Sequence, residues 1–105
     1  MAAVLVARSL GAGCILAVDR IADRLAMAKS LGATDVVLAN TAQQALDRRE
    51  GILALIGGRG ADVVVEATGA ISAFSEGISL LASGGRYLLV GLWAGQDIRS
   101  TFVLA

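Results

Sequence analysis

The residues from Gly57 to Gly69, Gly-Gly-Arg-Gly-Ala-Asp-Val-Val-Val-Glu-Ala-Thr-Gly, constrain the fold of this 105-residue chain more than any other segment. Three consecutive valines between glycine-containing turns are typical of a strand that is buried on both faces, as in parallel sheets. Such a strand needs other strands beside it and helices above and below it. The segment therefore predicts a strand over about residues 62–67 within an α/β domain.

The rest of the chain supplies the expected partners in alternation. Helical patterns cover residues 1–10, 21–31, 41–56 and 71–82, and strand patterns cover about 14–19, 35–38 and 86–90. Thr41 and Gln44 form a potential capping box, and Gly84-Gly85 is expected to turn the chain into the last strand. We predict one α/β domain over residues 1–105, a doubly wound and mostly parallel sheet. Residues 91–105 are expected to form a loop with at most one short extended segment.

The composition excludes several classes of function. Nine basic and nine acidic residues balance, so no net charge favours nucleic acid as a partner. No uncharged apolar run approaches the roughly 18 residues that cross a membrane. The chain has no histidine and one cysteine, which excludes Ser-His-Asp sites, Cys-His sites and histidine metal sites within it. We therefore expect no catalytic residue and no metal ligand here, and the single cysteine weakly favours a cytoplasmic location.

Asp19 is the most informative single residue. It ends a predicted buried strand just before a helix, where an acid can accept hydrogen bonds from the ribose hydroxyls of a dinucleotide. Its charge would repel the 2′-phosphate of NADP. The alternative is that Asp19 only caps the helix that follows. Arg20 and Arg24 could flank the adenine, or they could be solvated arginines on the helix surface.

Glycine-containing turns after strands give a second group of candidates. Thr68-Gly69 and Val90-Gly91-Leu92 follow predicted strands, at the edge where open α/β sheets bind ligands. Each turn alone is weak evidence, because turn-making explains it equally well. Gly11-Ala-Gly13 and Gly57-Gly-Arg-Gly60 precede strands instead, so neither fits a phosphate-binding loop, which must follow a strand and open a helix. Glu66 is either a strand-end carboxylate or part of the same crevice.

Four segments in this order resemble the cofactor-binding domain of the zinc-type medium-chain alcohol dehydrogenase family. They are Leu10-Gly-Ala with Ile15-Leu-Ala-Val-Asp-Arg20, Arg24–Asp35, Gly57–Gly69 and Gly84–Gly91, and the likeness covers about residues 1–95. The resemblance implies NAD as cofactor, with Asp19 at the adenosine ribose and Arg24 near it. It also implies that Thr68-Gly69 and Val90-Gly91-Leu92 border the cofactor, the latter near the nicotinamide.

The departures from this family pattern are equally specific. The family places a strand and a Gly-x-Gly-x-x-Gly loop immediately before the helix with which this chain begins. The family's catalytic domain, with its cysteine and histidine zinc ligands, is not represented, and neither is the last part of the cofactor domain. We therefore expect a piece of a dehydrogenase, truncated at both ends. Its inner strands, 15–18 and 63–65, are expected either to pair directly or to remain unpaired and cause self-association.

Three functions remain open at this point. The leading hypothesis is a partial NAD-binding domain of an alcohol dehydrogenase-like oxidoreductase, which transfers hydride between an alcohol or carbonyl and nicotinamide. The second is a noncatalytic or vestigial domain that keeps the fold without the cofactor. The third, a fragment of an S-adenosylmethionine-dependent methyltransferase, also places an acid after its second strand. We expect NAD as the partner, without nucleic acid or membrane.

Overall fold

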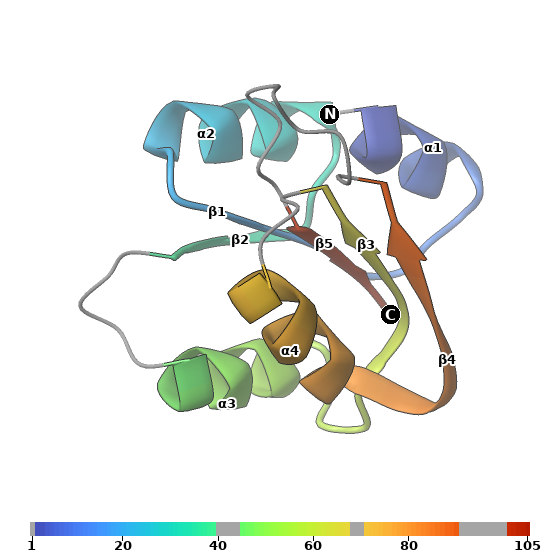
Figure 1. The fold of residues 1–105 in the computed structure, drawn as a ribbon. Coiled ribbons are helices and arrows are strands. Elements are labelled where there is room, and N and C mark those ends of the chain that lie inside the picture. The colour runs from blue at the N-terminus through green and yellow to red at the C-terminus, as the bar shows by residue number, and fades with distance from the viewer. Residues whose placement is uncertain (1, 40–44, 68–70, 91–100) are drawn as a thin grey trace.

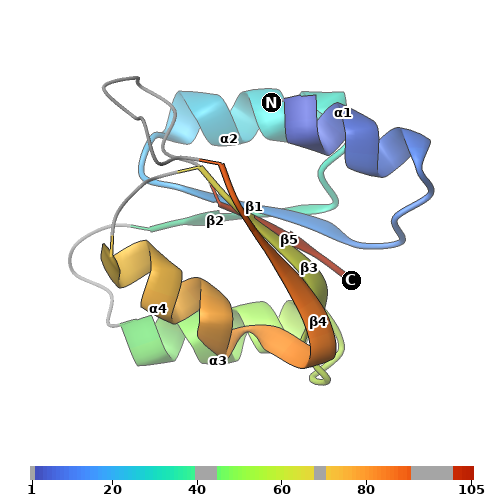
Figure 2. The same ribbon diagram turned by 45° about the vertical axis from the view of Figure 1, so that its right-hand side comes forward.

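The computed structural model describes residues 2–39, 45–67, 71–90 and 101–105. In chain order the elements are α1 (Ala2–Ser9), β1 (Ile15–Asp19), α2 (Ala22–Leu31), β2 (Asp35–Leu38), α3 (Ala45–Leu55), β3 (Ala61–Glu66), α4 (Ile71–Ser79), β4 (Leu81–Leu89) and β5 (Thr101–Leu104). The five strands form one sheet in the order β2-β1-β5-β3-β4. Helices cover both faces of this sheet, α1 and α2 on one and α3 and α4 on the other (Figure 2). The predicted Rossmann-like α/β class is confirmed.

The alternation of side chains along β1 explains why both faces must be covered. All five of its residues are buried. Ile15 and Ala17 pack with Val4, Leu25 and other residues of α1 and α2, whereas Leu16 and Val18 pack with residues of α3, β3 and β5. Successive side chains of a strand point to opposite faces, so a strand that is apolar on both faces separates two cores.

A strand from the end of the chain occupies the centre of the sheet. β5 pairs antiparallel with β1 through Ile15↔Leu104 and antiparallel with β3 through Val63↔Leu104. The remaining pairs, β1 with β2 and β3 with β4, are parallel. Direct pairing of the two inner strands, which the sequence suggested, is therefore wrong. β5 lies between them and takes up the backbone groups that would otherwise be unpaired.

The boundary between α4 and β4 also differs from the prediction. We expected a helix to residue 82 and a strand from residue 86, but α4 ends at Ser79 and β4 begins at Leu81. Gly84 and Gly85 lie inside the strand, where the register with β3 shifts between Ala61 and Val63. Gly84 has φ +78°, which only glycine adopts at little cost. The two glycines thus form a bulge rather than the turn into the strand.

Close approach of the chain also explains why Gly60 and Gly85 are glycines. Gly60 has φ +99°, and a Cβ built on it would lie 2.7 Å from the backbone nitrogen of Ala82. A Cβ on Gly85 would lie 2.8 Å from the carbonyl oxygen of Ala61. Neither site has space for a side chain, so these glycines allow β3 and β4 to lie together where their pairing begins.

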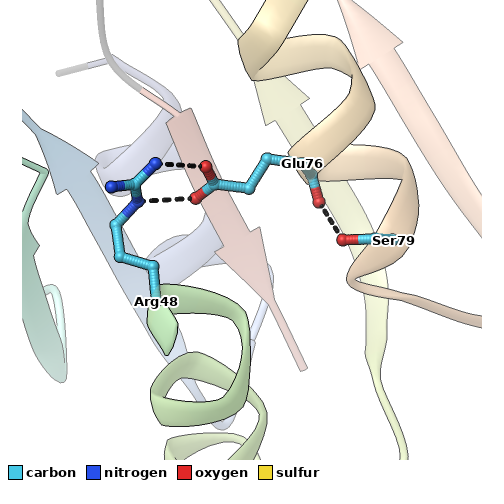
Figure 3. Close-up of polar contacts among 3 residues, drawn as sticks. All are labelled: Arg48, Glu76 and Ser79. Atoms are coloured by element: carbon cyan, nitrogen blue, oxygen red, sulfur yellow. Dashed lines mark hydrogen bonds and ion pairs between the residues drawn. The ribbon is translucent and has the colours of Figure 1, made fainter. Parts of the chain in front are cut away.

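An ion pair joins the two helices on the second face. Arg48 of α3 and Glu76 of α4 point toward each other, and Ser79 bonds back to the backbone of Glu76 (Figure 3). Arg48 donates two hydrogen bonds to the carboxylate, from Nε at 3.1 Å and from Nη2 at 2.6 Å. This paired geometry is the strong form of an arginine–carboxylate contact. The hydrogen bond that Arg48 donates to Glu76 raises the pKa of Arg48. The pair holds α3 against α4.

The predicted capping residues Thr41 and Gln44 lie outside the described residues.

Candidate functional site

The carboxyl ends of four strands meet at one edge of the sheet. Asp19 pairs in register with Leu38 of β2, and Glu66 pairs in register with Leu89 of β4. From the centre, the β1–α2–β2 and β3–α4–β4 units lead away in opposite directions and place their helices on opposite faces (Figures 1 and 2). The point of divergence lies between β1 and β3. In open α/β sheets such a switch point forms the crevice that binds ligands.

Buried polar side chains gather at this switch point. Among the described residues, the buried polar or charged ones are Asp19, Glu66 and Thr101, which are 3%, 0% and 9% exposed. Thr101 is the first residue of β5, and it pairs in register with Val18 of β1 on one side and with Glu66 of β3 on the other. Buried polar groups are costly in a core unless they have partners, so their concentration at one edge marks this edge as the chemically distinctive part of the molecule.

Asp19 stabilises the entry into α2. Its Oδ1 accepts a hydrogen bond of 2.9 Å from the backbone N–H of Ile21, the residue that precedes the helix. Its carbonyl oxygen accepts a bond of 2.8 Å from the N–H of Ala39, just beyond β2. Asp19 therefore has a local structural role, an Asx turn before α2, although the N-cap position considered for it is taken by Ile21, which makes no side-chain cap bond. This role leaves the dinucleotide hypothesis open, because a carboxylate has two oxygens and can accept several hydrogen bonds.

The two arginines that follow differ in their surroundings. Arg20 is exposed, as expected for a solvated surface residue. Arg24 is half-buried, and within the described part of the chain its Nη1 is buried and has no hydrogen-bond partner. A buried donor of this kind costs free energy until an acceptor reaches it. Arg24 therefore carries unused hydrogen-bonding capacity in the first turn of α2, the helix that follows Asp19.

Only one of the remaining predicted site residues, Val90, lies within the described part of the chain. Val90 lies at the end of β4, 63% exposed, and its N–H donates a hydrogen bond of 2.9 Å to the carbonyl oxygen of Glu66. Thr68, Gly69, Gly91 and Leu92 lie outside the described residues. The structure thus brings Asp19, Glu66 and Val90 to one edge of the sheet, and the roles predicted for these residues in cofactor binding stay predictions.

Glu66 has a partner that the sequence did not suggest. The hydroxyl of Tyr87 on β4 donates a hydrogen bond of 3.1 Å to Glu66 Oε1. The ring of Tyr87 meets Phe74 of α4 edge to face, with centroids 5.1 Å apart. A Cβ on Gly77 of α4 would lie 2.7 Å from the Tyr87 ring, so this helix needs glycine where it crosses the ring. Burial raises the pKa of Tyr87, and the neighbouring carboxylate of Glu66 raises it further.

Thr101 and Tyr87 were missed for different reasons. Thr101 reaches the switch point only because β5 pairs with strands far away in the sequence, and no local pattern indicates that pairing. Tyr87 had a usable signal, since it is the only tyrosine and stands within a predicted buried strand. A buried tyrosine hydroxyl needs an acceptor, and Glu66 is the acid within the neighbouring predicted strand.

Among the described residues, no group of three or more cysteine, aspartate or glutamate side chains is arranged to hold a metal ion. No helix in the described segments is both long enough and apolar enough to span a bilayer.

The fold and the switch point together define the class of this chain, a doubly wound α/β domain of the dinucleotide-binding type. A family model described as zinc-binding dehydrogenase matches residues 1–105. The chain belongs to this family. The matched region is the cofactor-binding part of zinc-type alcohol dehydrogenases, in which zinc belongs to the separate catalytic domain. This membership gives no support to the methyltransferase alternative.

Individual relatives agree with the family. The chain is 48% identical over 94 residues to 5-exo-hydroxycamphor dehydrogenase of Pseudomonas putida, covering 89% of this chain and 26% of that protein. It is 41% identical over 90 residues to L-threonine 3-dehydrogenase of Bacillus velezensis, covering 86% and 25%. A crystal structure of an alcohol dehydrogenase from Thermotoga maritima matches with a TM-score of 0.77 and 38% identity, covering 90% and 26%. The chain therefore spans about a quarter of the length of these relatives.

Proposed function

We propose that this chain is the adenosine-binding portion of an NAD-dependent, alcohol dehydrogenase-like oxidoreductase. The observation that carries the proposal is that Asp19, at the carboxyl end of β1, and Arg24, in the first turn of α2, each offer a polar group suited to a ribose near the switch point. Asp19 supplies a buried carboxylate at the end of β1, and Arg24 supplies a buried donor without a partner in the described chain. A ribose with neighbouring hydroxyls and acceptors matches both groups. Arg20, on the exposed side of the same turn, is proposed to lie at the rim of the adenine site.

We assign the other end of the cofactor to the residues that follow β3 and β4 in the sequence. Val90 lies at that edge, and we propose that Thr68, Gly69, Gly91 and Leu92 border the cofactor beside it. When bound, NAD would supply the hydride acceptor for alcohol oxidation in a complete enzyme. The residues of this chain would bind and orient the cofactor, and we assign no catalytic group among them. We place the parent enzyme in the cytoplasm, where its free Cys14 would stay reduced.

One structural observation favours the noncatalytic alternative. β5 occupies the central position and runs antiparallel to its neighbours. A parallel strand in that position would lead through a glycine loop into a helix N-terminus, which is the usual seat of a pyrophosphate. β5 supplies no such helix, so we propose that any binding of NAD by this chain is weak. A chain that keeps the fold and binds no nucleotide is the second candidate.

The test is a calorimetric titration of NAD and NADP into the parent chain, Asp19→Asn and Asp19→Ala. In Asp19→Asn the side-chain oxygen can still accept the hydrogen bond from the N–H of Ile21, but the negative charge is removed. A change in nucleotide affinity in this variant therefore reports cofactor recognition rather than a loss of folding. We expect NAD affinity to fall about tenfold, equivalent to about 1.4 kcal/mol, and the preference for NAD over NADP to shrink. Removing the charge takes away the repulsion of the 2′-phosphate.

Asp23→Asn is the matched control, because Asp23 is an exposed carboxylate in the first turn of α2. It should leave both affinities unchanged. An unaltered ratio of NAD to NADP affinity in Asp19→Asn would count against the assignment of Asp19. No measurable binding of either nucleotide to the parent chain would favour the second candidate.

A further inference from the structure

Glu66 joins the ends of β3 and β4 through both its side chain and its backbone. Its Oε1 accepts the hydrogen bond of 3.1 Å from the hydroxyl of Tyr87, and its carbonyl oxygen accepts the bond of 2.9 Å from the N–H of Val90. Glu66 is 0% exposed and pairs in register with Leu89, which lies between those two residues in the sequence. The end of β4 is therefore attached to Glu66 on both sides of Leu89.

The ring of Tyr87 is in turn held by α4, which packs on β3 and β4. Phe74 meets the ring edge to face, and a Cβ built on Gly77 would lie 2.7 Å from Cε2 and 3.0 Å from the hydroxyl oxygen. The helix backbone thus lies directly against the ring and leaves it no space to move toward α4. The hydroxyl that bonds to Glu66 is consequently fixed by α4 as well as by β4.

Two residues of this arrangement are unfavourable choices for stability alone. A carboxylate without exposed surface loses its hydration, and an apolar side chain in its place often costs less. Gly77 lies inside a helix, where alanine is more favourable. Local choices that oppose stability concentrate at functional sites. Both of these choices meet at one hydrogen bond, which indicates a role for this bond beyond holding the fold.

We propose that Glu66 and Tyr87 are positioning residues for the nicotinamide end of the cofactor. This inference rests on the function proposed above, in which Val90 borders the cofactor. The bond between Tyr87 and Glu66 transmits the contact with α4 to the end of β3, and so fixes where β4 ends relative to β3. Both side chains act through the backbone of Val90 and need no contact with the cofactor.

A purely structural bond would have a different effect on ligand binding. Loss of a structural bond would leave the affinities unchanged or lower the affinity for every nucleotide alike. Loss of a positioning bond would affect ligands that carry nicotinamide. NAD and ADP-ribose separate these cases, because ADP-ribose has the same adenosine and both phosphates but lacks the nicotinamide.

The test is an NMR titration of NAD and ADP-ribose into the parent chain, Tyr87→Phe and Glu66→Gln. Tyr87→Phe removes the hydroxyl and keeps the ring against Phe74. We expect its affinity for NAD to fall about threefold while its affinity for ADP-ribose stays at the parent value. Glu66→Gln keeps an oxygen that can accept the bond from Tyr87, so this conservative variant should retain the parent affinities for both ligands.

Gly77→Ala tests the contact with α4 while the hydroxyl of Tyr87 is still present. The added methyl group must displace the ring, so we expect the same selective loss of NAD affinity as in Tyr87→Phe. Ser75→Ala is the matched control, since Ser75 is an exposed residue of the same helix. It should leave both affinities unchanged.

Hydrogen exchange of the Val90 amide tests the positioning without any ligand. We expect faster exchange in Tyr87→Phe and Gly77→Ala than in the parent chain and Ser75→Ala, because the bond to Glu66 would open more often. Equal changes for NAD and ADP-ribose in Tyr87→Phe, or unaltered exchange of Val90, would overturn this inference and leave the proposed function standing. A parent chain that binds neither ligand would overturn both.

Discussion

Tyr87 is the only tyrosine of the chain, and its hydroxyl joins β4 to the buried carboxylate of Glu66. Burial and the charge of Glu66 both raise its pKa above the ordinary value of 10.0. The neutral phenol is therefore favoured in the folded chain relative to the unfolded chain. As the pH rises above about 10, the unfolded chain loses its phenolic proton first, so the free energy of unfolding falls. Below that pH the contribution is fully present.

We predict that Tyr87→Phe removes this alkaline decline. At neutral pH the variant should lose about 1–2 kcal/mol of unfolding free energy, because Glu66 loses a hydrogen-bond donor. Denaturant unfolding at neutral and alkaline pH measures both effects. Tyrosinate absorbance of the parent chain reports the pKa of Tyr87 alone, since no other tyrosine contributes. A Tyr87 that ionises at its ordinary value in the folded chain would contradict the prediction.

The residues of the candidate site show what sequence reasoning can reach. Asp19 was found because a strand pattern and a helix pattern meet at it, and both patterns are local. The buried donor of Arg24 was only half anticipated, since the helical pattern indicated the place of Arg24 on the helix but not the burial of its side chain. Thr101 could not be found, because its position depends on contacts with Val18 and Glu66 in distant segments.

At the scale of elements, the strands with a simple apolar run were predicted closely. β1, β2 and β3 begin and end within one residue of their expected limits, since short apolar runs rich in β-forming residues determine them. β4 begins earlier than predicted, because Gly84-Gly85 forms a bulge that its composition does not distinguish from a turn. β5 was foreseen only as an extended segment. Four residues rich in β-formers predict a strand, but nothing local predicts its neighbours.

The position of β5 can be tested with the single native cysteine. Cys14 and Ala105 exchange two backbone hydrogen bonds of 2.9 and 3.0 Å, so their Cα atoms are about 5.5 Å apart, within the range for a disulfide. We predict that Ala105→Cys forms a bridge to Cys14 on oxidation and raises the free energy of unfolding by about 2–4 kcal/mol. Thermal melting of the oxidised and reduced forms of one protein provides the measurement and its control.

Two outcomes of that experiment would contradict the structure. Failure of the bridge to form, with both thiols reactive, would mean that β5 does not lie beside β1. A covalent dimer on a non-reducing gel would mean that the strand comes from another copy.

At the scale of the whole molecule, the central position of the sheet decides how well a nucleotide can bind. We predict that adding a strand with a Gly-x-Gly-x-x-Gly loop ahead of Met1 displaces β5 and raises both the melting temperature and NAD affinity. The added parallel strand would lead into α1 and place its helix N-terminus at the switch point. Calorimetry and thermal melting of the extended chain measure the two gains.

A second extension with alanines in place of the loop glycines should keep the melting gain and lose the gain in affinity. In the extended Ala105→Cys variant, oxidation before refolding would hold β5 beside β1 and should prevent both gains. Equal NAD affinity with and without the glycine loop would show that the pyrophosphate does not use it.

The central antiparallel strand also sets the order in which the chain can fold during synthesis. Residues 15 and 63 both pair with residue 104, so neither β1 nor β3 has both of its neighbouring strands until residue 104 has been translated. At about 5–20 residues per second, the interval between making Glu66 and Thr101 lasts roughly 2–7 s. Throughout that interval the facing sides of β1 and β3 offer unpaired backbone beside apolar side chains. We therefore expect a nascent chain in this state to bind chaperones that recognise extended apolar segments, and its yield to depend on them more than its final stability suggests.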